Sequence, residues 1–161
     1  MLVRKGEFMQ AFFTDYLSNL QEFHDEIRVA IKGLPPSALD WTADAEINSI
    51  TVLTVHLIGA ERYWIGDVIC GEDSGRDRAS EFKVQGLTEQ DLFQKLEEIE
   101  SYLRKALESL TLQDLEQKRI SPRNAREVSV GWALGHALKH SSLHLGHIQI
   151  TRQLWEQQQF D

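Results

Sequence analysis

Proline and cysteine are both scarce in this sequence of 161 residues, and each scarcity excludes a class of fold. There are 3 prolines and a single cysteine, Cys70. Because proline interrupts helices, so few of them permit long helical segments, and the glycine-poor periodic segments favour helices over a loop-rich β architecture. A lone cysteine cannot form an internal disulfide, which fits a reducing compartment.

Long apolar runs and an excess of basic charge are also missing. No stretch approaches the roughly 20 apolar residues that span a bilayer. No apolar run follows the basic start of MLVRKGEF, so this segment is not a secretory signal. The net charge of −8 argues against nucleic acid as the main partner, because phosphate binding needs a basic surface. We therefore expect a cytoplasmic protein that binds neither membrane nor nucleic acid.

The few basic residues gather loosely in two segments, Arg76 to Arg78 and Arg119 to Arg126. Both segments are expected to be loops. Solvated loop charge is the simpler interpretation, and a weak contact with an anion is the alternative.

The chain length suits a single domain over residues 1–161, and the first helical pattern opens it. This helix is expected from about Glu7 to Gly33, with its apolar residues spaced three and four apart. It ends where Gly33 and the pair Pro35-Pro36 cannot continue the hydrogen bonding of a helix. A short helical turn is expected over Ser37 to Trp41.

The second helix is expected to begin at Asn48 or Ser49, since either side chain can cap it, and to continue to about Cys70. The segment from Gly71 to Gly86 is polar and rich in glycine and charge, which indicates a loop. A connection of this length is unusual within a compact domain. It could carry the chain from one end of a helical bundle to the other.

The third helix has the clearest start signal, because Thr88 can cap it and Asp91 follows three residues later. The segment from Leu115 to Val128 is ambiguous and could form a small hairpin or an extended strap. The last helix is expected from about Ser129 to Gln158. Four amphipathic helices without a strong strand pattern predict an all-α fold, an antiparallel four-helix bundle.

Four of the 6 histidines lie within one short stretch of the last helix, at positions 136, 140, 144 and 147. Each helical residue turns by about 100°, so these four fall within an arc of roughly 80°. We expect them to face the inside of the bundle. Buried imidazoles need partners and cannot all be protonated at close range, and a divalent metal ion would satisfy both conditions.

His140 and His144 are one helical turn apart, the spacing with which two histidines of one helix grip a metal ion. His56, at the inner face of the second helix among apolar residues, is the natural third ligand. Three neutral histidines leave at least one coordination position open, as catalytic zinc sites do. His24 is interpreted as a core histidine with one satisfied nitrogen rather than as a metal ligand. A di-iron site is set aside, because no Glu-x-x-His motif lies near the cluster.

The segment His140-Ser-Ser-Leu-His144-Leu-Gly146-His147 resembles the His-x-x-x-His-x-Gly-Gln signature of the DinB-like superfamily. The segments Asn48-Ser49-Ile50 and Val55-His56-Leu57, the aromatic pair Tyr63-Trp64 and the Leu39-Asp40-Trp41 turn also resemble that superfamily. The resemblance implies a DinB-like four-helix bundle with a long crossover between the second and third helices. It implies His56, His140 and His144 as metal ligands, and a homodimer. His147 stands where the superfamily has Gln, and His136 is expected beside the ligands.

Two classes of function remain open from the sequence. In the first, zinc or nickel is the metal, and the protein is a transferase that activates a low-molecular-weight thiol against a small electrophilic substrate, as some relatives do. Hydrolysis by an activated water is the variant of this enzyme. In the second, the protein binds a metal or ligand without turnover, as a stress protein would.

Two residues are candidates for catalysis beside the metal. His147 or Tyr63 could position or deprotonate the incoming group. Arg62 could meet an acidic substrate, although a solvated arginine is the simpler interpretation, and Cys70 at a helix end is not expected to be the nucleophile. The four tryptophans are interpreted as packing residues of the core or of an interface.

Overall fold

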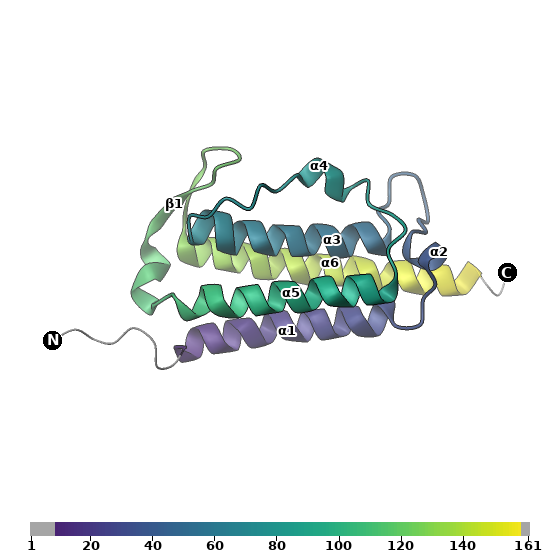
Figure 1. Cartoon of the computed structure of the whole chain (residues 1–161), viewed down its shortest axis with the longest axis horizontal. Coiled ribbons are helices and arrows are strands. Elements are labelled where there is room, and N and C mark those ends of the chain that lie inside the picture. The colour runs from purple at the N-terminus through teal and green to yellow at the C-terminus, as the bar shows by residue number, and fades with distance from the viewer. Residues whose placement is uncertain (1–8, 159–161) are drawn as a thin grey trace.

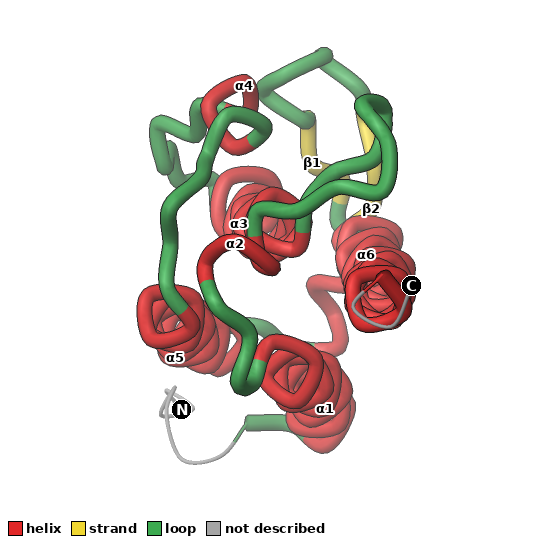
Figure 2. The backbone as a smooth tube through the Cα atoms, turned by 90° about the vertical axis from the view of Figure 1, so that its right-hand side faces the viewer, coloured by secondary structure: helices red, strands yellow, loops and turns green. Residues whose placement is uncertain are grey.

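The computed structural model describes residues 9–158, in which four long helices form a bundle (Figure 1). Viewed along the bundle, α1 (Ala11–Ile31), α5 (Glu89–Glu108), α3 (Ile50–Glu61) and α6 (Val130–Gln158) occupy its corners (Figure 2). The helices α1 and α6 run in one direction, and α3 and α5 in the other (Figure 1). The predicted all-α four-helix bundle is confirmed. Of the first expected helix, residues 7 and 8 lie outside the described part, as does the MLVRKGEF segment.

Local sequence explains where the first elements begin and end. Gly33 adopts a φ of 78°, which an L side chain rarely takes, and its amide donates to Glu89 at the start of α5. The short helix α2 (Pro36–Leu39) confirms the predicted turn. Ser49 caps α3, because its hydroxyl accepts the amide hydrogen of Val52.

The second long helix changes its geometry halfway, which the sequence does not predict. From Arg62 to Ile69 it continues as a π-helix, η1, where an α-helix is expected to Cys70. Gly66 lies in this segment, and a Cβ there would collide with the guanidinium of Arg62 and the hydroxyl of Tyr102. The wider turn and the missing side chain together let Arg62 fold back over its own helix.

A long crossover then returns the chain to the end of the bundle where α3 began (Figure 1). It contains the short helix α4 (Arg78–Glu81), and it is needed because α3 and α5 run in the same direction. The capping box of Thr88 and Asp91 starts α5, as predicted. The predicted long crossover is therefore confirmed.

The ambiguous segment before the last helix forms a small hairpin. After the 3-10 helix η2 (Leu112–Glu116), strand β1 (Lys118–Ile120) pairs antiparallel with β2 (Glu127–Ser129). The chain then enters α6 at Val130.

The inner face of α6 is not the histidine face, contrary to the prediction. His140 and His144 are half-buried at the edge of the bundle, and His147 is exposed. The buried face of α6 mixes small and large residues, so the periodicity of large side chains alone does not identify it. The buried residues of this face are Val130, Ala133, Leu134, Ala137, Ser141, Leu145, Ile148 and Thr151.

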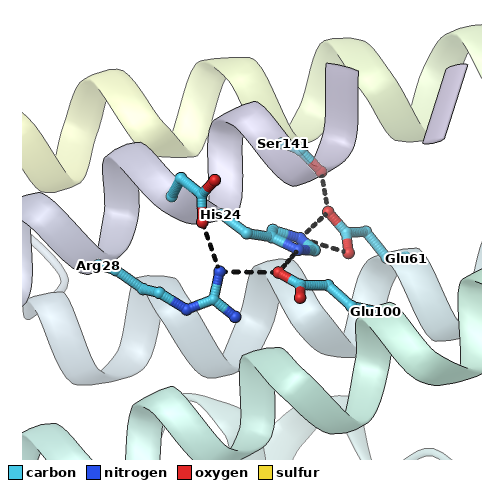
Figure 3. Close-up of polar contacts among 6 residues, drawn as sticks. His24, Arg28, Glu61, Glu100 and Ser141 are labelled. Carbon is cyan, nitrogen blue, oxygen red and sulfur yellow. Dashed lines mark hydrogen bonds and ion pairs between the residues drawn. The ribbon is translucent and has the colours of Figure 1, made fainter. Parts of the chain in front are cut away.

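A buried polar layer at mid-height separates two apolar clusters of the core. The first cluster includes Leu20 and lies toward the hairpin, and the second includes Ile27. Between them His24 of α1 is fully buried, with Nε2 3.0 Å from Oε2 of Glu61 and Nδ1 3.0 Å from Oε1 of Glu100 (Figure 3).

The same layer reaches all four long helices. Ser141 of α6 donates to Oε1 of Glu61 over 2.6 Å, and Arg28 of α1 pairs with Glu100 of α5 over 2.8 Å (Figure 3). The expectation of a core histidine with one satisfied nitrogen understates the arrangement, because both nitrogens of His24 face carboxylates.

The charge state of His24 follows from these partners. Burial alone would lower the pKa of His24, but the charges and hydrogen bonds of Glu61 and Glu100 outweigh it and raise this pKa to about 9. His24 is therefore a buried imidazolium at neutral pH.

Removal of the Glu61 carboxylate should destabilise the bundle strongly. Glu61→Ala leaves the His24 imidazolium without its fully buried partner, and we expect a loss of about 3–5 kcal/mol in the free energy of unfolding. Urea unfolding followed by circular dichroism measures it. Glu97→Ala, at an exposed position of α5, is the matched control and should change the free energy little. An equal and small effect of both substitutions would contradict the account.

The His24 pair also predicts how stability depends on pH. The folded-state pKa of about 9 lies above the unfolded value near 6.5, so the stabilisation is complete below about pH 6.5. It is lost progressively as the pH rises through about 9. We expect the urea midpoint to fall between pH 6.5 and 9.5 more steeply in the wild-type chain than in His24→Gln. If the urea midpoint falls equally with pH in both proteins, His24 is not the group that causes the pH dependence.

Candidate metal centre

Three histidines of the described residues meet at the edge of the bundle between α3 and α6. His56 comes from the middle of α3, and His140 and His144 from successive turns of α6. Each offers one ligand atom, and these atoms all lie within 4.8 Å of one another. The sequence-predicted set is thus brought together by the packing of α3 against α6.

The imidazole rings of the three residues face one another closely. The Nε2 atoms of His140 and His144 are 3.1 Å apart. The ring centroid of His56 lies 5.1 Å from that of His140 and 5.2 Å from that of His144. Two nitrogens that bind one zinc ion at about 2.0–2.1 Å with a tetrahedral angle lie about 3.3 Å apart, so the His140–His144 spacing suits a shared cation.

His56 is oriented by a carboxylate that the sequence does not reveal. Its Nδ1 lies 2.8 Å from Oε2 of Glu81, which is buried in α4 of the crossover. Because Glu81 occupies Nδ1, the Nε2 atom of His56 remains to face the other two rings. A carboxylate on the second nitrogen is the usual partner of a metal-binding histidine, and it fixes the tautomer and the ring orientation.

Glu81 is itself held from both sides. Arg76 forms two hydrogen bonds to its carboxylate, 2.6 and 2.8 Å long. Burial would raise the pKa of Glu81, but the hydrogen bonds from His56 and Arg76 outweigh it and lower this pKa, so the group is ionised. His56 therefore has a charged protein partner, although its neighbours in the sequence are apolar.

In the sequence, only a helical glycine, Gly59, is related to the position of Glu81. Gly59 lies one turn after His56, and a Cβ there would collide with the Glu81 carboxylate. The glycine lets the crossover close onto α3, but a single helical glycine does not identify what approaches it.

The two histidines of α6 have the properties of metal ligands. Their Nδ1 atoms are buried and have no hydrogen-bond partner among residues 9–158. Burial, followed by the neighbouring imidazoles, lowers the pKa of His140 to about 3 and that of His144 to about 4. Both rings are therefore neutral near pH 7 and carry a free lone pair. The Nε2 atoms of the two rings face each other at 3.1 Å, and a cation held by both would use their lone pairs.

The other two histidines of α6, His136 and His147, lie on either side of the candidate metal ligands His140 and His144 along the helix. His136 stacks on Trp132 with ring centroids 4.8 Å apart and also contacts Trp64. His147 is exposed, and its ring centroid lies 5.5 Å from that of His144. Neither belongs to the group whose ligand atoms lie within 4.8 Å of one another.

Tyr63 lies two helical turns beyond His56 and is buried. Its hydroxyl shares a 2.7 Å hydrogen bond with Ser121 and accepts the amide hydrogen of Arg123. Among the described residues it therefore contacts the loop of the hairpin rather than the three histidines.

Other residues considered from the sequence are engaged in structural contacts. Arg62 pairs with Asp67 and Glu72 and lies over the ring of Tyr102. Burial, then the charge of Glu72, raises the pKa of the Cys70 thiol, which makes it a poor nucleophile. The tryptophans pack in pairs, Trp41 against Trp155 and Trp64 against Trp132, as expected. Within residues 9–158, helices of the length and apolarity needed to cross a membrane are lacking.

Comparisons with known proteins agree with this fold. The family model described as "Protein of unknown function (DUF1572)" matches residues 7–161. No protein with a curated description matches the sequence. The fold is similar to that of YfiT from Bacillus subtilis, described as a probable metal-dependent hydrolase with an unusual four-helix bundle topology. The TM-score is 0.70 at 16% identity, and the match covers 93% of this chain and 91% of that chain.

Loss of the Glu81 charge should weaken metal binding without removing a ligand. Glu81→Gln keeps the size of the side chain but not the charge behind His56, and such partners are worth about 10–100-fold in metal affinity. Competition with a chromophoric zinc chelator measures the affinity. The control Glu97→Gln, at an exposed position of α5, should bind zinc as the wild type does. Wild-type affinity in Glu81→Gln would show that the carboxylate does not support the site.

Proposed function

The chain belongs to the DUF1572 family of proteins of unknown function, and from the geometry of its site we propose that it is a metal-dependent enzyme. The proposal rests on one observation. Three imidazoles from two helices offer ligand atoms within 4.8 Å of one another, and the Nε2 atoms of His140 and His144 have the spacing of two nitrogens on one ion. Membership of the DinB-like superfamily is part of the proposal, with zinc or nickel as the metal.

The roles of the protein groups follow from their contacts. His56, His140 and His144 would hold the ion, and three histidines leave coordination positions for a substrate or nucleophile. When bound, such an ion lowers the pKa of a coordinated water or thiol toward neutrality. Glu81 holds His56 in orientation through Nδ1, and Arg76 holds Glu81.

Two nucleophiles are supported by different arguments. The resemblance to thiol-dependent relatives favours a transferase that joins a low-molecular-weight thiol to a small electrophile. The similarity of fold to YfiT, a probable metal-dependent hydrolase, favours water. Both activities would use the same metal centre. Assays with and without a thiol distinguish them.

His147 and Tyr63 take different roles in this proposal. His147 is exposed beside His144, so it can exchange protons with solvent and is our candidate for the base that deprotonates the nucleophile. The Tyr63 hydroxyl is already engaged by Ser121 and Arg123, so we assign Tyr63 to positioning the hairpin loop. A homodimer in the cytoplasm stays our expectation from the resemblance and composition.

Turnover should depend on the three histidines. The zinc- or nickel-loaded chain is assayed with a bacterial thiol and 1-chloro-2,4-dinitrobenzene, and separately with 4-nitrophenyl esters without thiol. We expect one activity to appear, to vanish in His140→Ala/His144→Ala, and to fall about 10²–10⁴-fold in His147→Asn as a general base is lost. Lys139→Ala, at an exposed position of the same helix, is the control.

Each outcome decides between the candidates. Turnover only with thiol supports the transferase, and turnover of esters without thiol supports the hydrolase. Tight metal binding without turnover in either assay favours a non-catalytic metal-binding protein. Absence of metal binding contradicts the proposal as a whole.

A further inference from the structure

A cavity bordered by charged side chains lies where the crossover meets the loop of the hairpin. Its volume is about 270 Å³. The two basic segments of the sequence, which are far apart along the chain, both line it: Arg76 and Arg78 from the crossover and Arg123 from the hairpin loop. The fold thus brings three arginines from two distant loop segments to the same cavity.

Two carboxylates also line this cavity, and each accepts hydrogen bonds from the protein. Asp67 accepts hydrogen bonds from the amide and the hydroxyl of Ser74 and from Arg62. Asp73 accepts the amide hydrogen of Gly75. These carboxylates stabilise the loop and are not positioned to pair with the arginines.

Two of the three arginines have capacity for a ligand. Arg76 is committed to Glu81. Arg78 lies over the ring of Phe82 at 4.8 Å, a contact that leaves its N–H groups unused. No hydrogen bond or ion pair of the Arg123 side chain, or of Arg78, is formed with residues 9–158. Two guanidinium groups that line one cavity and pair with no carboxylate of residues 9–158 are the donor set for a carboxylate or a phosphate.

The cavity and the metal centre share a wall. Arg76 lines the cavity, lies 5.6 Å above the ring of Tyr63, and binds the carboxylate that holds His56. Tyr63 lines the same cavity, seven residues after His56 on the same helix. At about 1.5 Å per residue, the cavity lies about 10 Å from the histidines along that axis, within the length of a small metabolite.

We propose that this cavity is an anion subsite, which takes a carboxylate or phosphate group of the substrate. The reacting part of the same molecule would then lie at His56, His140 and His144. That second statement rests on the proposed function, whereas anion binding in the cavity does not. The subsite selects small acidic substrates, which a chain of net charge −8 would otherwise repel.

Anion binding is tested on the full chain freed of metal by chelation, so that phosphate cannot bind to an ion. Inorganic phosphate and succinate are titrated separately by calorimetry. We expect saturable binding of at least one of them, weakened about tenfold or more by Arg78→Gln and by Arg123→Gln, since one charge-assisted hydrogen bond contributes about that factor. Arg104→Gln, at an exposed position of α5, is the matched control and should bind like the wild type.

The outcomes distinguish the ligand and the proposal. Stronger binding of phosphate identifies a phosphate site, and stronger binding of succinate a carboxylate site. No saturable binding of either anion, or equal weakening by Arg104→Gln, overturns the subsite. Both arginines are exposed, and circular dichroism checks that each variant folds.

A separate comparison tests the subsite independently of the metal. His140→Ala/His144→Ala should lose metal-dependent turnover and keep anion binding. If the metal-dependent function fails while anion binding persists, the subsite stands alone. If the function holds, Arg78→Gln and Arg123→Gln should raise the KM for acidic substrates without changing that for neutral ones, and an unchanged KM would overturn the link between the two sites.

Discussion

The buried ion pair of His24 and Glu61 joins α1 to α3 in the centre of the bundle. It lies between two apolar clusters, and its hydrogen-bonding partners Glu100 and Ser141 extend it to all four long helices. A buried charge is tolerated only when it is paired and hydrogen-bonded, so this layer restricts the bundle to one register of its helices. Apolar contacts alone would restrict the sliding of helices less.

That register has a direct consequence for the histidines. Ser141, which donates to Glu61, follows His140 in α6, and Glu61 lies on α3 a little more than one turn beyond His56. The polar layer therefore fixes how far α6 is shifted along α3. With that shift fixed, His140 and His144 face His56 rather than lying above or below it.

The crossover supplies polar side chains that the four long helices do not place beside His56. Because α3 and α5 run in the same direction, the chain must travel back along the bundle, and it does so over α3 (Figure 1). On the way it delivers Glu81 to His56 and Arg76 to Glu81. A connection that the topology requires thus also supplies the polar groups that orient the edge of the bundle where the histidines meet.

The sequence predicts the helices from periodicity and local capping. It predicts the three histidines from the spacing of His140 and His144, the apolar neighbours of His56 and the resemblance of their motifs to a known superfamily. His140 and His144 are one turn apart in any helix, and Thr88 with Asp91 marks a helix start wherever it occurs. Partners across the fold are different, since Glu61, Glu81 and Glu100 are ordinary surface residues by type. Only tertiary packing decides that they are buried. For the same reason, the π-helix after Glu61 and the buried face of α6 are not predicted.

Anomalous diffraction at the zinc edge, from crystals of the full chain grown with one equivalent of zinc, shows whether the three histidines bind one ion. We expect a single strong peak bound by Nε2 of His56, His140 and His144, with bonds of about 2.0–2.1 Å. A peak at the His24–Glu61 layer or elsewhere on the surface, with the three imidazoles free of metal, would contradict it.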